Sequence, residues 1–526
     1  MTEAPALDPL AAWAAGAGDR PAVVGRAGTL SFAELNREVN RLAHGLAARG
    51  VGAGDRAVWC SPNHERVLAF MHACRKLGLV AIPMPYRLAV PEMRFLLDDA
   101  DAALVVADPG LAPRVAEAGA GLGALRLGVV TAGRAPAPGA GGPGWTTWDD
   151  LTAGAPDAEP PPPDGDELGT AMMYTSGTTG RPKGAVRSRT DRQLLGAMLA
   201  TLRFGEGEVH LTSGPLYHAG PNAFALLANL TGGSVVVLER FDPAAWLRLV
   251  TEHRVTSTFC TPTHLKRVLA LGEGALAAAD LSAMRTLIVN AAPVPFALKQ
   301  EVVARLGDRF LYEVYGSTEL GIDTILEPAD QLRKPGSCGR PYGGIEVRVV
   351  DGEGQALPTG EVGELYVRTT LAVDGYRGDH ELRQLPGGWR SVGDLAYVDD
   401  EGFVFICDRR DDLVITGGAN VYPAEVEAVL HRHPAVADAA VLGRPDDEWG
   451  STVHAVVQPW PGAELDVVEL ETLCRSQLAG YKVPRSWDVR DELPRTESGK
   501  LLKRELRAEL AGAAGPQERS PGDGPR

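Results

Sequence analysis

The 526-residue chain has few cysteines, no long apolar run and a shortage of positive charge. Its six cysteines make neither a C-x-x-C pair nor a zinc-like spacing, so we expect reduced thiols and no cysteine-bound metal. Fifty-two Lys and Arg face 68 Asp and Glu, which gives a formal net charge of −16. This sign opposes nucleic-acid binding, which depends on a basic surface that releases counterions from phosphates. A small anionic substrate stays open, because a local basic cluster can outweigh the net sign.

Membrane and export signals are also missing. No apolar run approaches the roughly 18 residues of a membrane-spanning helix, and the first residues carry acids where a signal peptide carries positive charge. The most apolar stretch, Phe224–Leu238, is interrupted by glycine and polar residues and predicts a helix, a turn and a buried strand. We therefore expect a cytoplasmic protein without a transmembrane segment.

Glycine and proline, by contrast, are plentiful, at 62 and 39 residues. Many of them lie in the segment Gly133–Glu167, which contains APAPGAGGPG and PDAEPPPPDGDE. Such composition favours extended or flexible backbone and supplies little core material. The segment is predicted to be a linker or a surface excursion.

The remaining pattern predicts an α/β fold. An amphipathic helix at Ser31–Ala47 alternates with short apolar runs, as expected of helices that cover a largely parallel sheet. The expected buried strands are Ala57–Cys60, Leu79–Pro83, Ala103–Ala107, Ser234–Leu238, Thr286–Val289 and Leu311–Val314. Between Gly344 and Ile406 the period shortens towards two, which predicts antiparallel strands such as Glu346–Val350 and Gly363–Val367.

After Arg410 the pattern starts again. It predicts a helix with Pro423 in its first turn, strands at Val436–Leu442 and Val453–Gln458, and a helix at Asp466–Leu478. These elements are enough for a separate small domain, and the last residues have the composition of a disordered tail.

The segment YTSGTTGRPKG at Tyr174–Gly184 carries the strongest chemical signal. It follows an apolar strand-like run and precedes a helix that Thr190 and Gln193 are expected to open as a capping box. Glycines let backbone amides turn towards an anion, and hydroxyls and a lysine add further donors. The expected phosphate-binding groups are those of Thr175, Ser176, Gly177, Thr178, Thr179, Gly180, Lys183 and Gly184. The spacing differs from G-x-x-x-x-G-K-[ST], so a P-loop NTPase is excluded.

This segment resembles the signature of the adenylate-forming superfamily, and further motifs follow in that family's order from about Asp19 to Leu510. The resemblance is closest to the acyl-CoA synthetase branch. It implies a large N-terminal domain of parallel and mixed sheets with helices and a β-barrel-like subdomain, and a small mobile α+β C-terminal domain. The implied boundaries are 1–408 for the large domain, 409–412 for a hinge, 413–511 for the small domain and 512–526 for the tail.

The family's nucleotide site carries over residue by residue. The resemblance assigns adenine stacking to Tyr315, a phosphate contact to Thr318 and Mg²⁺ binding to Glu319 with Thr178, and an oxygen set of this kind suits a hard cation. It also implies that Asp394 accepts hydrogen bonds from ribose hydroxyls and that Arg409 is the matching cation. The other implied nucleotide contacts are Ala291, Ala292, Pro293, Gly316 and Ser317.

The resemblance also implies two half-reactions, with ATP, Mg²⁺ and coenzyme A as cofactors. Lys500, in PRTESGKLLKREL, corresponds to the catalytic lysine of adenylate formation. The small domain would then swing about Asp411 and bring Gly417 and Gly418 towards the pantetheine of coenzyme A.

The acid substrate is expected to be largely apolar, such as a fatty or related acid. His218, in PLYHAGP, resembles the catalytic gate of the acyl pocket, and Ala219 stands where amino-acid-activating relatives have an Asp. The small residues Gly220, Ala223 and Ala225 would leave space, and Thr261, Pro262 and His264 resemble the opposite lining.

Several alternatives stay open. The acyl acceptor of this AMP-forming acid–thiol ligase is expected to be coenzyme A, but a carrier protein or an amine would use the same motifs. A second copy of the chain is a further candidate partner. A non-catalytic adenylate-binding protein is disfavoured, because Lys183, Glu319, Asp394, Arg409 and Lys500 are intact. The segment Leu371–Pro386 is only a loose version of its family counterpart, and no role is assigned to it.

Overall fold

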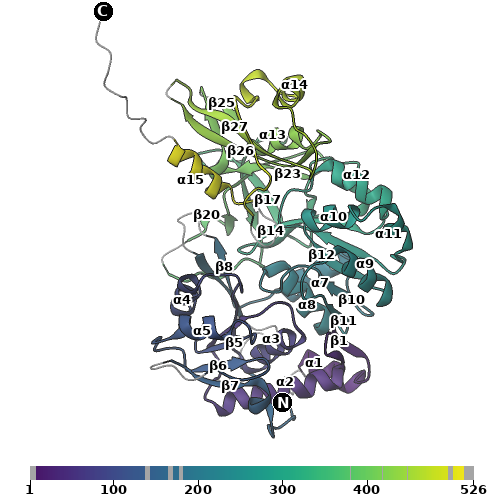
Figure 1. Ribbon diagram of the computed structural model, residues 1–526, viewed down its shortest axis with the longest axis vertical. Coiled ribbons are helices and arrows are strands. Elements are labelled where there is room, and N and C mark those ends of the chain that lie inside the picture. Colours follow the sequence, from purple (N-terminus) through teal and green to yellow (C-terminus); the bar gives the residue numbers. More distant parts are fainter. Residues whose placement is uncertain are drawn as a thin grey trace, which may run out of the picture. The chain divides into compact units, whose positions relative to one another are not determined.

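The computed structural model describes residues 8–136, 142–163, 170–176, 182–378, 381–417, 419–446, 448–495 and 501–513. The chain forms two compact units (Figure 1). The first holds residues 1–294, 298–348 and 366–392, and the second holds residues 295–297, 349–365 and 393–526.

A nine-stranded sheet forms one half of the first unit. Its strand order is β16 (Arg340–Pro341), β15 (Gly321–Leu326), β14 (Leu311–Ser317), β13 (Thr286–Val289), β12 (Ser257–Cys260), β10 (Val209–Thr212), β11 (Ser234–Val237), β1 (Pro21–Gly25) and β2 (Gly28–Ser31). The pairs from β1 to β14 are parallel, and antiparallel pairs close both ends. Every residue of β12 and β13 is buried, as expected of parallel strands covered on both faces.

An eight-stranded sheet forms the other half. Its order is β19 (Gly375–Tyr376), β9 (Pro182–Arg187), β8 (Thr170–Ser176), β4 (Val80–Pro83), β3 (Arg56–Cys60), β5 (Leu104–Ala107), β6 (Leu127–Val130) and β7 (Gly144–Thr147). The strands from β8 to β7 are parallel, whereas β8, β9 and β19 pair antiparallel.

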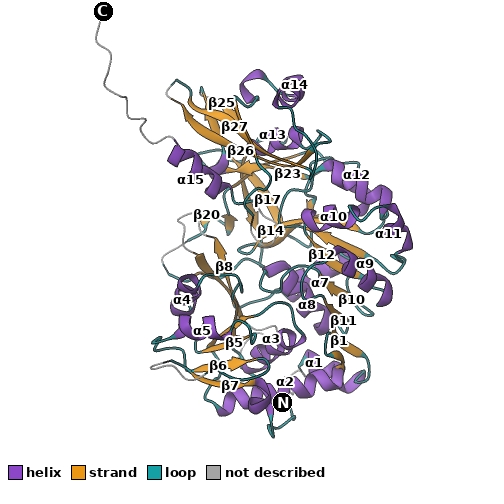
Figure 2. Cartoon of the chain, in the orientation of Figure 1, coloured by secondary structure: helices purple, strands orange, loops and turns teal. Residues whose placement is uncertain are grey.

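Helices cover these sheets (Figure 2). They are α1 (Pro9–Gly16), α2 (Phe32–Ala48), α3 (Glu65–Leu77), α4 (Val90–Asp99), α5 (Ala112–Gly119), α6 (Trp148–Thr152), α7 (Arg192–Thr201), α8 (Ala219–Leu230), α9 (Pro243–Glu252), α10 (Pro262–Leu269), α11 (Glu273–Ala278), α12 (Phe296–Arg305) and the 3-10 turn η1 (Pro328–Asp330). Side chains of α9, α10 and α12 fill the core against the nine-stranded sheet, and those of α4 and α5 fill the core against the eight-stranded sheet. Each sheet therefore has a hydrophobic core of its own.

Antiparallel strands link the two units in sequence. Strand β17 (Glu346–Val350) pairs with β18 (Gly363–Arg368). In the first unit β18 also pairs with β21 (Trp389–Ser391), and β21 pairs with β20 (Arg383–Leu385). In the second unit β18 pairs with β22 (Asp394–Val398), and β22 pairs with β23 (Val404–Arg409).

The second unit continues with a 3-10 turn, η2 (Arg410–Asp412), and a hairpin of β24 (Val414–Thr416) and β25 (Ala419–Val421). A three-stranded sheet follows, made of β26 (Val436–Asp446), β27 (Gly450–Pro459) and β28 (Ser486–Val489). Its remaining elements are α13 (Pro423–Leu430), α14 (Val467–Gln477), η3 (Gly480–Lys482) and α15 (Lys503–Ala513).

The predicted mixed α/β fold is confirmed, and each strand and helix named from the sequence is present within one or two residues, except the β14, β26 and β27 strands, which run longer. Residues 393–408, assigned to the large domain by the sequence, group with the second unit. The hinge at 409–412, the domain mobility and the barrel-like subdomain stay predictions. Among the described helices, none combines the length and apolar character of a membrane span.

Two local predictions were wrong. The segment Gly133–Glu167 is not merely a linker, because it contributes strand β7 and helix α6, and Trp148 is completely buried. The tryptophans in this Gly/Pro-rich stretch supply core material that composition alone hides. The helix α7 is capped by Asp191, whose side chain accepts a hydrogen bond from the backbone of Leu194, and not by Thr190.

Candidate active site

The predicted phosphate-binding segment joins two antiparallel strands at the margin of the eight-stranded sheet. Thr175 in β8 lies opposite Lys183 in β9, and residues 177–181 between them lie outside the described residues. The predicted roles of Gly177, Thr178, Thr179 and Gly180 therefore stay predictions, as does that of the Ser176 side chain.

The second site segment is the turn between β14 and β15 in the nine-stranded sheet. Its residues Thr318–Leu320 follow a bulge between Tyr315 and Gly316. A side chain at Gly316 would collide with the backbone of Gly321, so only glycine permits this close approach. The hydroxyl of Ser317 accepts a hydrogen bond from the backbone of Leu320 and closes the turn.

Glu319 links this turn of the nine-stranded sheet to strands of the eight-stranded sheet. Its Oε1 accepts a hydrogen bond from the Thr175 hydroxyl at 3.2 Å and another from the Tyr376 hydroxyl at 2.8 Å. Its backbone carbonyl accepts a third from the amide of Val373 at 2.7 Å. The Nζ of Lys183 lies 5.6 Å from the centre of the Tyr376 ring. The structure thus assembles Thr175, Lys183 and Glu319 around a tyrosine that the sequence analysis gave no role.

The carboxylate of Glu319 fits a hard cation. Both side-chain hydrogen bonds end on Oε1, and among the described residues none is recorded on Oε2, which leaves one oxygen for a metal. No group of three or more His, Cys, Asp or Glu forms a complete metal site within the described ranges. A metal held here would therefore share oxygen ligands with a substrate, as Mg²⁺ usually does with phosphates.

The predicted adenine contacts lie on neighbouring strands. Ala291 follows β13 and has a φ of 77°, in the left-handed region that a residue with a side chain seldom adopts. Backbone conformations of this kind tend to occur where a ligand or a tight turn requires them. Tyr315 lies partly exposed in β14, the parallel neighbour of β13. The structure therefore places Ala291 and Ala292 at the end of the strand next to Tyr315, and Pro293 is exposed beside them.

The predicted ribose contacts lie in the second unit. Asp394 and Arg409 are register partners across β22 and β23, and Arg409 Nε lies 3.2 Å from Asp394 Oδ1. The aspartate side chain is 9% exposed and the arginine side chain 47% exposed, so the pair has one buried and one solvated member.

Other predicted residues of the second unit are only partly described. The backbone amide of Gly417 donates to the carbonyl of Trp449 at 2.9 Å, and the Trp449 ring packs where a Gly417 side chain would be. Gly418 and Lys500 lie outside the described residues.

His218 lies at the start of α8. Burial lowers its pKa to about 4, so the imidazole is neutral near pH 7. Its Nε2 is buried and has no recorded hydrogen-bond partner among the described residues, and its ring centre lies 4.5 Å from that of Tyr217. These features suit a neutral gate better than a charged catalytic group.

The expectation about small residues near His218 was wrong. The ring of Phe259 occupies the space beside Gly220, Ala223 is exposed, and Ala225 is fully buried. They therefore do not leave one shared space. Thr261 and His264 instead form a reciprocal capping box at the start of α10, and His264 stacks on Phe241 with ring centres 4.0 Å apart.

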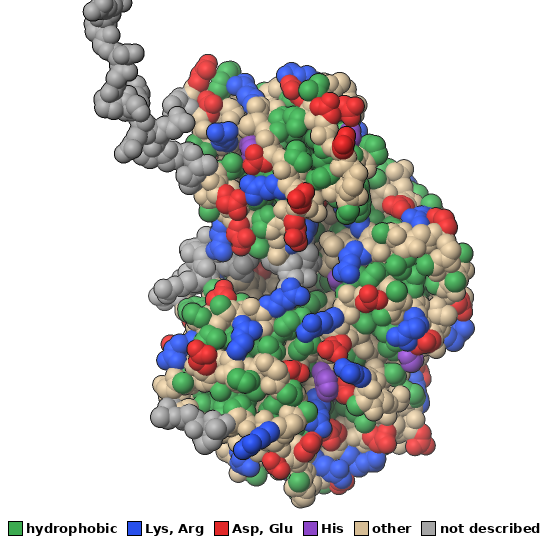
Figure 3. Space-filling model, viewed as in Figure 1, with side chains coloured by type: hydrophobic (Ala, Val, Ile, Leu, Met, Phe, Trp, Pro, Cys, Tyr) green, Lys and Arg blue, Asp and Glu red, His purple; other side chains and the backbone are tan. Residues whose placement is uncertain are grey.

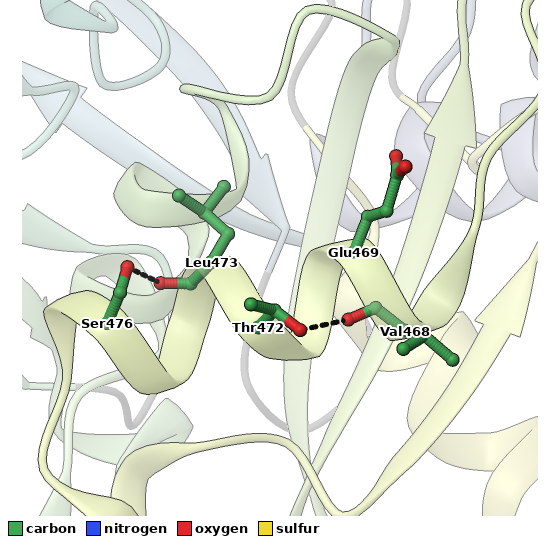
Figure 4. Close-up of a pocket in the computed structure, with 5 residues that line it drawn as sticks. All are labelled: Val468, Glu469, Thr472, Leu473 and Ser476. Carbon is green, nitrogen blue, oxygen red and sulfur yellow. Dashed lines mark hydrogen bonds between the residues drawn. The ribbon is translucent and has the colours of Figure 1, made fainter.

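A small surface hollow lies elsewhere, on α14 (Figure 4). Its lining residues, Val468, Glu469, Thr472, Leu473 and Ser476, all belong to this one helix, and Val468 is 67% exposed. None of the predicted site residues lines it. On the face drawn in Figure 3, acidic and basic side chains are interspersed over the surface.

Comparisons with known proteins show the family of the chain. The family model for AMP-binding enzymes matches residues 10–377, and the model for their C-terminal domain matches residues 425–500. A feruloyl-CoA synthase of Amycolatopsis sp is 39% identical over 91% of this chain and 93% of its own length. A fatty acid–[acyl-carrier-protein] ligase of Streptomyces coeruleorubidus is 34% identical over 93% of each chain.

A solved structure has the same architecture. The o-succinylbenzoate CoA synthetase of Bacillus subtilis, in complex with an acyl-adenylate intermediate, superposes with a TM-score of 0.82 and 29% identity over 95% of this chain and 98% of its own. The chain belongs to the AMP-binding, or adenylate-forming, enzyme family. The acyl-CoA synthetase interpretation, an AMP-forming acid–thiol ligase that uses ATP, is thereby confirmed.

Proposed function

We propose that the chain activates a largely apolar carboxylic acid and transfers it to coenzyme A, and that aryl-propenoic acids such as ferulate are the first substrates to test. The 39% identical feruloyl-CoA synthase supports this acid class. Ala219 after His218 supplies no carboxylate for an amino group, which disfavours amino acids.

Activation is needed because a carboxylate is already anionic and its oxygen is a poor leaving group. The acid attacks the α-phosphate of ATP, releases pyrophosphate and forms an acyl adenylate. Lys183 and the hydroxyl of Thr175, whose residues are register partners in β9 and β8, would hold the departing phosphates. Lys500 supplies positive charge to the reacting oxygens, and a preorganised charge of this kind stabilises the transition state without reorganisation.

The observation that carries this proposal is the position of Glu319. It is tied through Oε1 to the strand that begins the phosphate-binding segment, and Oε2 points to no recorded partner among the described residues. Glu319 and Thr178 would hold Mg²⁺, which supplies charge neutralisation to the phosphates when bound.

The second half-reaction involves the second unit. Rotation about Asp411 would withdraw Lys500 and bring Gly417 and Gly418 towards the thiol of coenzyme A. The thiol then attacks the acyl carbon of the adenylate, and AMP leaves. Asp394 and Arg409 hold the ribose through both steps.

An acid panel tests the proposal. Purified protein with ATP, Mg²⁺ and coenzyme A should release pyrophosphate with ferulate or a related apolar acid, and mass spectrometry should detect the matching thioester. An absence of ATP–pyrophosphate exchange with every aryl and aliphatic acid of the panel would contradict it.

A carrier protein is the second candidate acceptor, because a 34% identical relative is a fatty acid–[acyl-carrier-protein] ligase. The same reaction with holo acyl carrier protein in place of coenzyme A separates the two. Faster acyl transfer to the carrier than to coenzyme A would replace the first candidate. An amine acceptor would instead yield an amide, and hydroxylamine does not cleave an amide under conditions in which it cleaves a thioester.

A further inference from the structure

A second basic residue lies in the same strand as Lys183. Arg187 ends β9, and because side chains alternate along a strand, Arg187 and Lys183 point to the same face. Arg187 is only partly exposed, in contrast with Arg189 two residues later, which is exposed. No predicted role in the reaction accounts for a sheltered arginine at this position.

The guanidinium of Arg187 lies against the turn that carries Glu319. Its NH2 group donates a hydrogen bond to the carbonyl of Thr318 at 3.0 Å. Its NH1 group lies 3.6 Å from the place where a Gly321 side chain would begin. The two terminal nitrogens of the guanidinium therefore reach both ends of the turn Thr318–Leu320. All of these residues belong to the first unit.

Acidic side chains act electrostatically on this guanidinium. Burial tends to lower the pKa of Arg187, and the charges of Asp323, Asp374 and Glu319 oppose that effect. Asp323, in β15, is completely buried. Asp374 accepts a hydrogen bond from the amide of Ser188 at 2.7 Å and donates its own amide to Val186 at 2.8 Å. These negative charges thus offset part of the cost of burying the Arg187 guanidinium.

Residues 373–376, which include Asp374, also contact Glu319 directly. Val373 donates to the Glu319 carbonyl and Tyr376 donates to its side chain, while Asp374 between them is bonded to β9. Residues 373–376 therefore hold Glu319 itself, and Arg187 holds the carbonyl of Thr318 just before it.

We propose that Arg187 is a positioning residue, whose guanidinium fixes the Thr318–Leu320 turn so that Glu319 presents its second carboxylate oxygen to the metal of bound ATP. The proposal rests on the proposed function. Arg187 does not touch the substrate, and it acts through Thr318 and Glu319. A lysine cannot replace it fully, because one ammonium lacks the planar fork whose NH2 group bonds the Thr318 carbonyl while its NH1 group lies beside Gly321.

The first experiment measures metal binding directly. Mn²⁺ binding in the presence of ATP is followed by electron paramagnetic resonance in wild type, Arg187→Lys, Arg187→Gln and Arg189→Gln. Loss of a hydrogen bond made by a charged group predicts Mn²⁺ dissociation constants about 10-fold higher in both Arg187 variants. The Arg189→Gln control should bind Mn²⁺ like wild type. Unchanged Mn²⁺ binding in both Arg187 variants would overturn the proposal.

The second experiment separates positioning from folding. Arg187→Gln removes a positive charge that favours the buried Asp323, so a double variant, Arg187→Gln with Asp323→Asn, removes both charges. Hydrogen exchange of peptides covering 315–326 should be faster than in wild type in each variant, whereas exchange in α9 and α10 should not change. Wild-type metal binding in a folded double variant would overturn the proposal.

The two proposals fail in different ways. The proposed function fails if wild type gives no pyrophosphate exchange with any acid. The role of Arg187 fails if wild type is active and the Arg187 variants match it in three measurements. These are the Mg²⁺ concentration for half-maximal pyrophosphate exchange, the KM for the acid, and the hydrogen-exchange protection of residues 315–326. An equal loss of activity at all Mg²⁺ concentrations would likewise overturn it.

Discussion

Glu319 in the first unit is a predicted ligand of Mg²⁺, Asp394 in the second is a predicted ligand of the ribose of ATP, and the structure holds them in contrasting ways. Glu319 accepts hydrogen bonds from the uncharged hydroxyls of Thr175 and Tyr376, both on one oxygen. Asp394 faces a positive charge, the half-exposed guanidinium of Arg409. Neutral donors orient a carboxylate without cancelling its charge, whereas an ion pair orients it and cancels it.

This difference matches the two predicted roles. A carboxylate that must attract a cation keeps its net charge when its supports are hydroxyls. A carboxylate that must accept hydrogen bonds from ribose needs lone pairs more than net charge, and a mobile, solvated arginine can exchange partners when the sugar arrives. The first region is therefore prepared for a metal and the second for a polar, uncharged group.

The largest effect is expected at a third arrangement, in which charges are buried for structure. Lys503, at the start of α15, lies 2.7 Å from Glu427 and is 15% exposed, and the charges of Glu427 and Asp408 raise its pKa. Lys503→Met leaves both carboxylates sheltered without their cation. The free energy of unfolding of the second unit should fall by about 3 to 5 kcal/mol.

Denaturant titration with hydrogen exchange on β26 and β27 measures this loss. The neighbouring Arg504 is exposed, and Arg504→Met is the matched control. A loss below about 1 kcal/mol in Lys503→Met, the range of surface ion pairs, would show that this cluster behaves like the Asp394–Arg409 pair.

A reciprocal pair of variants tests the assignment of the two half-reactions. Lys500→Ala should slow adenylate formation by about 10² to 10³, the usual result of removing one preorganised charge-stabilising donor, which is about 3 to 4 kcal/mol. Asp411→Pro should impair thioester formation more than adenylation, because proline restricts the torsions of the predicted hinge. Pyrophosphate exchange and thioester formation are measured separately, and equal losses in both steps for both variants would contradict the assignment.

Tyr376→Phe tests the neutral support of Glu319. A hydrogen bond to a charged group is worth about 1.5 to 3 kcal/mol, so kcat/KM for adenylation should fall about 10-fold or more. The Mg²⁺ concentration for half-maximal rate should rise as well. The exposed Tyr481, changed to Phe, provides the control. A Tyr376→Phe enzyme with wild-type Mg²⁺ dependence would remove this tyrosine from the site.

Tyr376 also shows where sequence reasoning stopped. The strands, the main helices and the order of the motifs follow from local periodicity and from residue types, and these were predicted well. The pairing of β19 with β9 is a contact between residues far apart in the chain, and no local pattern reveals it. Only this pairing brings Tyr376 beside Lys183 and Glu319.

Two of the other misses also arise from packing between residues far apart in the chain. Gly220, in helix α8, is small because the ring of Phe259 from strand β12 packs against it. Trp148 is buried although the residues around it have a linker's composition. Asp191 rather than Thr190 caps α7, which is a shift of one residue that pattern reading seldom resolves. Arg187 gave no signal because its partners, Thr318 and Asp323, lie more than a hundred residues away.

Low pH should reduce the stability of the first unit through a buried histidine. Burial lowers the pKa of His210 to about 3, and its Nδ1 lies 2.9 Å from the Ser257 hydroxyl. The unfolded state binds a proton below about pH 6.5, whereas the folded state stays neutral, so stability falls as the pH falls from there. At pH 5.5 this residue alone costs about 1 kcal/mol.

His210→Asn removes that pH-dependent cost. Relative to pH 7.5, the variant should lose about 1 kcal/mol less than wild type at pH 5.5, as measured by denaturant unfolding at both pH values. His72, His218 and His264 of the first unit and His454 of the second also have lowered pKa values through burial, so acid should destabilise both units, the first through more groups. Equal pH slopes in wild type and variant would contradict the neutral, buried state of His210.

The smallest effect is expected at the ion pair itself, and salt distinguishes it from the hydroxyl-supported site. Because Arg409 is half exposed, Arg409→Gln should change the free energy of unfolding by less than about 1 kcal/mol, and 1 M salt, with a screening length of about 3 Å, should remove most of that difference. The loss in Tyr376→Phe arises from a neutral donor at 2.8 Å and should persist at the same salt concentration. Parallel measurements of unfolding and of adenylation at 0.1 M and 1 M salt compare the two directly. If salt suppressed both losses equally, Glu319 would be held by charge as Asp394 is, and the distinction between a site prepared for a metal and a site prepared for a sugar would fail.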